Sequence, residues 1–145
     1  MSKTKEETRF NFEQLFYLVS KNPVKKIGTI AIGVTILGEG FYATIAGSVC
    51  STEDMFNKKE GRTIALKRLR SKNPKTRNVI ISDKDFDNCN FFKILEGLEL
   101  SFMCFRRCID DNICDEKFKN VLGFIKKEVS RLNEAESILE KENKQ

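Results

Sequence analysis

A β-hairpin near the middle of the chain is the feature that most constrains the fold. Residues 29–37 (TIAIGVTIL) are rich in β-branched side chains, which is typical of a buried strand. Gly38-Glu39-Gly40 has the length of a hairpin turn, and residues 41–50 (FYATIAGSVC) return as a second strand. The sequence therefore predicts a small antiparallel sheet built around this hairpin.

Two further segments are candidate strands of the same sheet. In residues 9–20 the alternation of Phe10 and Phe12 favours a strand, although the apolar run that follows fits a strand or a short helix. We expect a strand that Asn22-Pro23 ends, because the residue before a proline is pushed out of the helical region. Residues 79–81 (VII) predict a short edge strand or an extended link.

The remaining segments predict three helices. Residues 61–71 form a basic helix that buries Ile64, Ala65 and Leu69 and turns Arg62, Lys67, Arg68 and Arg70 outward. From residue 87 to 110 an apolar set steps by three and four, which marks a second helix. That set is Phe91, Ile94, Leu98, Phe102, Phe105 and Ile109.

The last predicted helix has a coiled-coil-like seam. After a break at residues 110–112, apolar side chains alternate by four and three, with Glu136 as the one interruption. The seam comprises Phe118, Leu122, Ile125, Val129, Leu132 and Leu139. At roughly 25 residues this helix would be about 37 Å long. A sheet this small cannot cover it, so we expect self-association; the alternative is a monomeric helical hairpin with a frayed polar tail.

The expected fold is thus α+β: a small antiparallel sheet with a basic helix and a long C-terminal helical hairpin. We expect a single domain over residues 1–145, with a β-rich part at 9–82 and the hairpin for self-association at 87–142. No apolar run approaches the ~20 residues of a membrane helix, and no secretory signal is recognisable, so we expect no membrane association and a cytoplasmic location.

The composition disfavours catalysis and metal binding. The chain has no histidine, which is the commonest general base and the usual partner of a serine or cysteine nucleophile. The five cysteines are odd in number and contain no CxxC pair, which argues against a disulfide framework and favours small thiols buried in helices. Without histidine a zinc site needs four thiolates, and the spacing does not suggest one. We expect a non-catalytic protein without metal or cofactor.

Positive charge is concentrated in one segment. Residues 58–77 contain nine basic side chains and one acid and carry +8, whereas the whole chain carries +5 and the remainder therefore −3. Such a segment attracts phosphates and pairs with them directly. Three interpretations compete: a solvated helix face, a nucleic-acid surface, and a pocket for a small nucleotide whose base stacks on an aromatic ring.

Residue chemistry selects the candidate ligand contacts. Phosphates would be held by Lys58, Lys59, Arg62 and Arg68, and a base would stack on Phe56 or Phe91. Arg106 and Arg107 would face a ligand at a subunit junction. The alternative for these two arginines is an ordinary helical ion pair, with Asp110 and Asp111 respectively.

Residues 47–69 carry a resemblance to a known family. After a strand ending in Cys50, the chain reads Asp-x-Phe-x-Lys-Lys-x-Gly-Arg-x-Ile-Ala, with Asp54 at its start and Ala65 at its end, and then a basic helix. With the hairpin before it and the helical hairpin after it, this segment resembles the type one Thoeris anti-defence protein family. The match is close over about 23 residues and extends elsewhere only to the layout.

The resemblance implies a phage-encoded sponge in the cytoplasm of a bacterial host. Such proteins sequester cyclic ADP-ribose isomers without cleaving them, and some relatives also bind cyclic oligonucleotides at separate sites. It further implies a homo-oligomer, up to a hexamer, assembled through the helices. The alternative function is a phage inhibitor that binds a host protein, a defence protein or nucleic acid through the basic segment.

Overall fold

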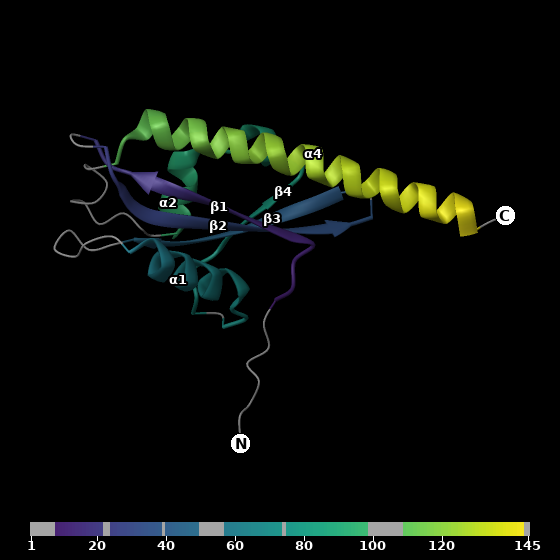
Figure 1. Cartoon of the computed structure of the whole chain (residues 1–145), viewed down its shortest axis with the longest axis horizontal. Helices are drawn as coiled ribbons and strands as arrows, with labels where there is room; N and C mark the ends of the chain where they lie inside the picture. The colour runs from purple at the N-terminus through teal and green to yellow at the C-terminus, as the bar shows by residue number, and fades with distance from the viewer. Residues whose placement is uncertain are drawn as a thin grey trace, which may run out of the picture.

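A four-stranded antiparallel sheet forms the centre of the molecule, as the computed structural model of the chain shows (Figure 1). The structure describes residues 8–21, 24–38, 40–49, 57–73, 75–98 and 109–143. The strands lie in the order β1-β2-β3-β4. Their bounds are Phe12–Val19 for β1, Lys26–Leu37 for β2, Gly40–Val49 for β3 and Val79–Ser82 for β4. The predicted α+β class is confirmed.

The predicted hairpin is the pair β2–β3, whose register runs from Gly28 opposite Val49 to Leu37 opposite Gly40. Gly38 in the turn has a φ of 58°, in the left-handed region that glycine adopts without a steric penalty. The ambiguous segment 9–20 is a strand, because β1 pairs with β2 along its length. Segment 79–81 is also a strand, and β4 lies at the edge of the sheet beside β3.

Helices cover both faces of the sheet, which gives three layers (Figure 1). Helix α1 (Lys58–Arg70) packs on β2 and β3, whereas α4 (Asp111–Asn143) packs on β1 from the other side. Helix α2 (Phe91–Leu98) contacts β3, β4 and α4, and a short 3₁₀ helix, η1 (Phe86–Asn88), precedes it.

The two faces of the sheet carry side chains of different size. The face under α4 holds large aliphatic residues such as Ile30, Ile32 and Ile45, which join Phe16 and Phe118 in the main core. The face under α1 carries Ala31 and Ala46, which form a second, smaller core with the helix. Small side chains on this face let α1 lie close to the strands.

Helix α1 begins at Lys58, three residues before the predicted start at Gly61. The cause is a local capping interaction: the side-chain oxygen of Asn57 accepts a hydrogen bond from the backbone N–H of Glu60 at 3.1 Å. The helix ends at Arg70, because Ser71 is extended. Two basic residues, Lys58 and Lys59, are therefore helical and not part of a preceding loop.

The prediction of one helix from residue 87 to 110 is wrong at its start. Residues 86–88 form the 3₁₀ helix η1, and α2 begins at Phe91, where Asn90 accepts a hydrogen bond from the backbone of Lys93 at 2.9 Å. The rest of that prediction, residues 99–108, lies outside the described residues.

Helix α4 is longer than predicted, with 33 residues and a length of about 50 Å. Asp110 does not break the helix but precedes it, since its carboxylate accepts a hydrogen bond from the N–H of Ile113 at 3.1 Å. The predicted seam faces the sheet at Phe118, Leu122, Ile125 and Val129, which are buried. Beyond them the helix projects past the sheet (Figure 1), and Ile138 and Leu139 are exposed.

Two cysteines, Cys89 and Cys114, lie within the described residues, and both are free thiols. Cys114 is buried at the start of α4, where its sulfur lies 3.4 Å from the backbone N–H of Val19. Cys50, Cys104 and Cys108 lie outside the described residues. Among the helices that the structure describes, none combines the length and the apolar character needed to cross a membrane.

Candidate anion-binding surface

Helix α1 turns one side to the sheet and the opposite side to solvent. Gly61, Ala65 and Leu69 recur at intervals of four residues and are buried against the strands. The cationic side chains lie on the remaining surface of the helix. Those that are exposed are Lys58, Lys59, Arg62, Lys67 and Arg68. The side of α1 that packs on the sheet is therefore apolar, and most of the positive charge of the helix lies on the side that faces solvent.

Two arginines near the end of α1 are held by the sheet. Arg68 donates a hydrogen bond from Nη1 to the carbonyl oxygen of Gly47 in β3 at 2.8 Å. Arg70 forms a bidentate ion pair with Glu13 in β1. The positive charge of Arg70 is therefore compensated by the Glu13 carboxylate. The charge of Arg68 is not compensated by its partner, because that partner is a neutral carbonyl.

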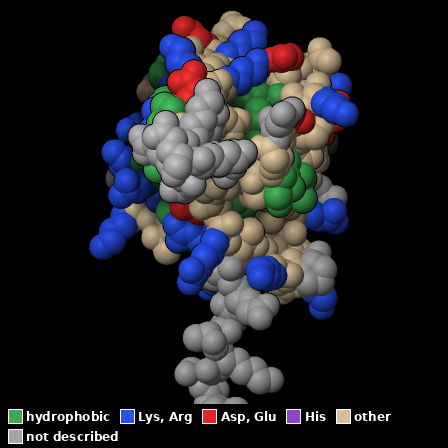
Figure 2. All heavy atoms as spheres, turned by 90° about the vertical axis from the view of Figure 1, so that its right-hand side faces the viewer, with side chains coloured by type: hydrophobic (Ala, Val, Ile, Leu, Met, Phe, Trp, Pro, Cys, Tyr) green, Lys and Arg blue, Asp and Glu red, His purple; other side chains and the backbone are tan. Residues whose placement is uncertain are grey.

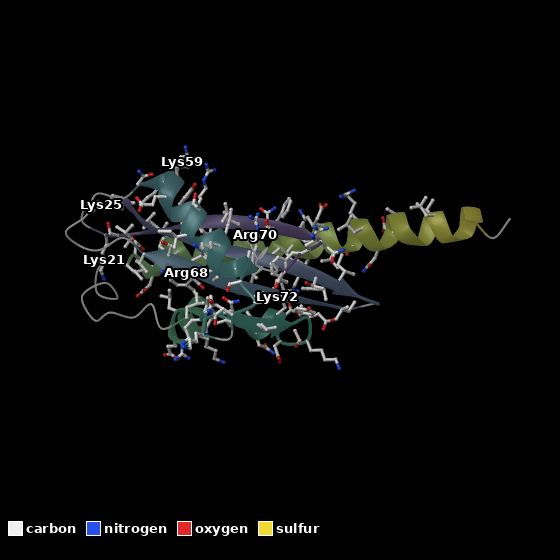
Figure 3. All side chains as sticks on the ribbon, turned by 90° about the horizontal axis from the view of Figure 1, so that it is seen from below. Lys21, Lys25, Lys59, Arg68, Arg70 and Lys72 are labelled. Atoms are coloured by element: carbon white, nitrogen blue, oxygen red, sulfur yellow. The ribbon has the colours of Figure 1, made fainter. Side chains whose placement is uncertain are left out.

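Further cations come from the connection between β1 and β2. Lys21 and Lys25 are exposed and lie at the same end of the sheet as Lys59 (Figure 3). Lys26, the first residue of β2, is exposed as well. We call the combined set the basic surface. It consists of Lys21, Lys25, Lys26, Lys58, Lys59, Arg62, Lys67 and Arg68.

The basic surface has little acidic compensation. Within the described part of the chain, the ion pair between Arg70 and Glu13 is the one that involves α1, and it uses no member of the basic surface. The other pairs join residues of α4 to one another or to Asp87. On the end of the molecule that Figure 2 faces, where α4 projects, acidic side chains lie mainly in the upper part, on the α4 side. Uncompensated charge of one sign attracts an anionic ligand.

An aromatic ring lies within the basic surface. The Nζ atom of Lys26 is 4.7 Å from the centroid of the Tyr17 ring, and the Nζ atom of Lys58 is 5.4 Å from the same centroid. Both distances are in the range of a cation–π interaction. Tyr17 in β1 thus lies beside Lys26 of β2 and Lys58, the first residue of α1.

The structure brings four of the predicted contacts together. Lys58, Lys59, Arg62 and Arg68 all lie on α1 and are exposed. The assignment of Phe91 is corrected. This side chain is fully buried in the main core between Phe16 and Phe118, so it has no surface on which a base could stack.

Three other predicted contacts, Phe56, Arg106 and Arg107, lie outside the described residues. Sequence reasoning missed Tyr17, Lys21, Lys25 and Lys26. A doublet of lysines after a proline was visible in the sequence, but its place beside α1 depends on the pairing of β1 with β2.

Comparisons with known proteins give no relative. No family model matches the chain, and no curated protein or solved structure is significantly similar to it. Within the described residues, no group of three or more cysteine, aspartate or glutamate side chains is placed to hold a metal ion.

Proposed function

We propose that this protein binds a cyclic nucleotide through the basic surface and sequesters it without cleaving it. The observation that carries the proposal is the row of exposed cationic side chains on α1, with Lys21, Lys25 and Lys26 from the β1–β2 connection at the end of the sheet where Lys59 lies. Within the described residues, none of these cations forms an ion pair with an acid. Lysine and arginine bind phosphate groups through charge-assisted hydrogen bonds.

Binding without catalysis suits the residue types present. The chain has no histidine to act as a general base, and the basic surface offers hydrogen-bond donors but few acceptors. Donors of this kind stabilise a phosphate in its ground state, whereas hydrolysis also needs a group that activates water. A site composed in this way retains its ligand.

The narrower identity rests on the resemblance of residues 47–69 to the type one Thoeris anti-defence family. On that basis the ligand is a cyclic ADP-ribose isomer or a cyclic oligonucleotide, and the protein is a phage-encoded sponge in the host cytoplasm. Binding in excess of the signal would keep the downstream effector inactive.

Self-association belongs to the same proposal. The C-terminal part of α4 projects beyond the sheet and exposes Ile138 and Leu139, each by 58%. A second copy that packs on this end would cover them. Because pockets bury a ligand better than open surfaces do, subunit contacts would also help to enclose a small nucleotide.

Nucleic acid is the second candidate ligand, and one observation favours it. The basic surface is not confined to α1 but includes Lys21 and Lys25, which lie at the same end of the sheet as Lys59 (Figure 3). A phosphate backbone would follow such an extended surface, and its affinity would fall steeply as salt is added. An enclosed small nucleotide would respond less to salt. An inhibitor of a host or defence protein would use the same surface against an acidic partner.

The test is a calorimetric titration of the full chain with cyclic ADP-ribose isomers and with cyclic di- and trinucleotides. Bound ligand is then released by heating and its integrity is checked by mass spectrometry. Tight binding with intact ligand recovered is the expected result. The absence of heat with every nucleotide, or the recovery of a cleaved product, would contradict sequestration.

A further inference from the structure

Three elements of the fold meet at the ring of Tyr17. The ring belongs to β1, while the ammonium groups that lie 4.7 and 5.4 Å from its centroid belong to Lys26 in β2 and Lys58 in α1. Because the two distances share one centroid, the ammonium groups of Lys26 and Lys58 lie within about 10 Å of each other. Like charges repel, so the fold brings them together at a cost in electrostatic energy.

A β-bulge directs Lys26 to this place. Leu18 pairs with Gly28, but its neighbour Val19 pairs with Lys26, so Ile27 is an extra residue in β2. In regular alternation Lys26 would share the face of Gly28 and lie on the α4 side. With the bulge, Ile27 packs against the main core and Lys26 emerges on the α1 side, where Tyr17 lies.

Tyr17 itself faces α1 because of its position in β1. Its neighbours Phe16 and Leu18 are buried in the main core on the α4 side, whereas Leu15 packs on the smaller core under α1. Side chains along a strand alternate between faces, so residues 15 and 17 share the α1 side. The ring therefore lies on the same face as the basic surface.

Lys26 and Lys58 have no acidic partner among the residues that the structure describes. Lys58 is also the first residue of α1, where the helix dipole adds positive potential. A negatively charged group at this point would interact favourably with both ammonium groups and with the helix end.

We propose that Tyr17, Lys26 and Lys58 form a subsite for one phosphate group of the ligand. Its assignment to a nucleotide rests on the proposed function; the subsite itself requires only a phosphate. The two lysines exchange their contact with the ring for charge-assisted hydrogen bonds to phosphate oxygens, which are the stronger interaction. The Tyr17 ring then borders the phosphate, with the nucleoside lying towards the remaining cations of the basic surface.

Intrinsic fluorescence gives a direct test. The chain has no tryptophan and two tyrosines, so Tyr42→Phe leaves Tyr17 as the sole emitter. Inorganic pyrophosphate, which does not absorb in the tyrosine band, is titrated into this variant, with sodium chloride of equal ionic strength as the reference. We expect a saturable change in emission with pyrophosphate that chloride does not produce. A response identical to that of chloride would overturn the subsite.

Charge variants in the Tyr42→Phe background locate the effect. Lys26→Gln and Lys58→Gln should each raise the pyrophosphate concentration at half-change by at least about fivefold, because each removes a hydrogen-bonded charge. The matched control is Lys127→Gln, which removes one exposed positive charge from α4 on the opposite side of the sheet. Equal shifts in all three variants would show that pyrophosphate binding depends only on the net charge of the protein, which would contradict the proposal.

The subsite and the proposed function fail separately in these experiments. If pyrophosphate binds as expected but no cyclic nucleotide gives heat with the wild type, the subsite stands and the proposed ligand is wrong. If a cyclic nucleotide binds the wild type and both lysine variants with equal affinity, the proposed function stands and the subsite is wrong.

Discussion

Arg70, the last residue of α1, is clamped to Glu13 of β1 by two parallel hydrogen bonds. The Nε and Nη2 atoms of the guanidinium lie 2.8 and 2.6 Å from the two carboxylate oxygens. The pair joins the helix to an edge strand that is distant from it in the sequence. It also separates Arg70 from the basic surface, although the arginine belongs to the same cationic run in the sequence.

Glu13→Gln tests this pair. Both side chains are partly exposed, so we expect a loss of at most about 1 kcal/mol in the free energy of unfolding. The variant also frees the Arg70 charge, so pyrophosphate should bind more tightly at low salt. Urea unfolding and pyrophosphate titration measure the two effects, with Glu134→Gln on α4 as the matched control. Weaker pyrophosphate binding by Glu13→Gln would contradict the electrostatic account.

Thr29 carries a buried hydroxyl that is a source of instability. Its Oγ1 atom has no hydrogen-bond partner within the described part of the chain, and the residue is fully buried on the α1 side of β2. Thr29→Val keeps the β-branched shape and removes the unsatisfied group, so unfolding should require about 1 kcal/mol more. Thr35→Val, at a half-buried position of the same strand face, should change stability by less than about 0.5 kcal/mol. A loss of stability in Thr29→Val would show that the hydroxyl has a partner.

Gly33 is required by the packing of Phe10. A Cβ atom added at Gly33 would lie 2.5 Å from the ring of Phe10, which covers the glycine on the α1 side. Gly33→Ala should therefore destabilise the protein by about 1–3 kcal/mol. In a Phe10→Ala background the same change should cost much less, because the clash is gone. Additive losses in the double variant, measured by urea unfolding, would contradict this contact.

Cys114 makes stability fall at alkaline pH. Burial raises the pKa of its thiol above its ordinary value, although the hydrogen bond from the Val19 backbone opposes the shift. The folded state then holds the thiol proton more tightly than the unfolded state does. The resulting contribution to the free energy of unfolding is fully present below the ordinary pKa of the thiol and is lost as pH rises through the pKa of the folded state. Between about pH 8 and about pH 10, wild-type stability should decline more steeply than that of Cys114→Ala. Parallel declines would contradict a raised pKa.

Local signals in the sequence predicted the fold well. The β-branched run at residues 29–37 and the Gly38 turn gave the hairpin, and the spacing of Phe118, Leu122 and Ile125 gave the buried side of α4. The errors lie at helix starts. Asn57 and Asp110 extend α1 and α4 towards the N-terminus because single side chains cap their first turns.

The candidate site was only partly predictable, for a different reason. The cations of α1 lie within one short stretch of the sequence, residues 58–70, and four of them were predicted as candidate contacts. Tyr17 and Lys26 were not, because their position depends on a bulge at Ile27 that alternation of residue types does not reveal. The same limit explains the wrong assignment of Phe91. The sequence does not distinguish an aromatic residue that faces a ligand from one that faces the core, and Phe91 is fully buried.

The proposed function requires that the α1 side of the molecule binds nucleotide phosphates. This is tested by calorimetry with a Lys59→Gln/Arg62→Gln variant. The measured quantity is the dissociation constant of the cyclic nucleotide that binds the wild type most tightly. The matched control is Lys93→Gln/Lys127→Gln, which removes the same charge from exposed positions on α2 and α4. We predict at least about a hundredfold weaker binding for the first variant, from two lost charge-assisted hydrogen bonds, and less than about a twofold change for the control. Equal affinities of the two variants would place the ligand elsewhere and contradict binding at α1.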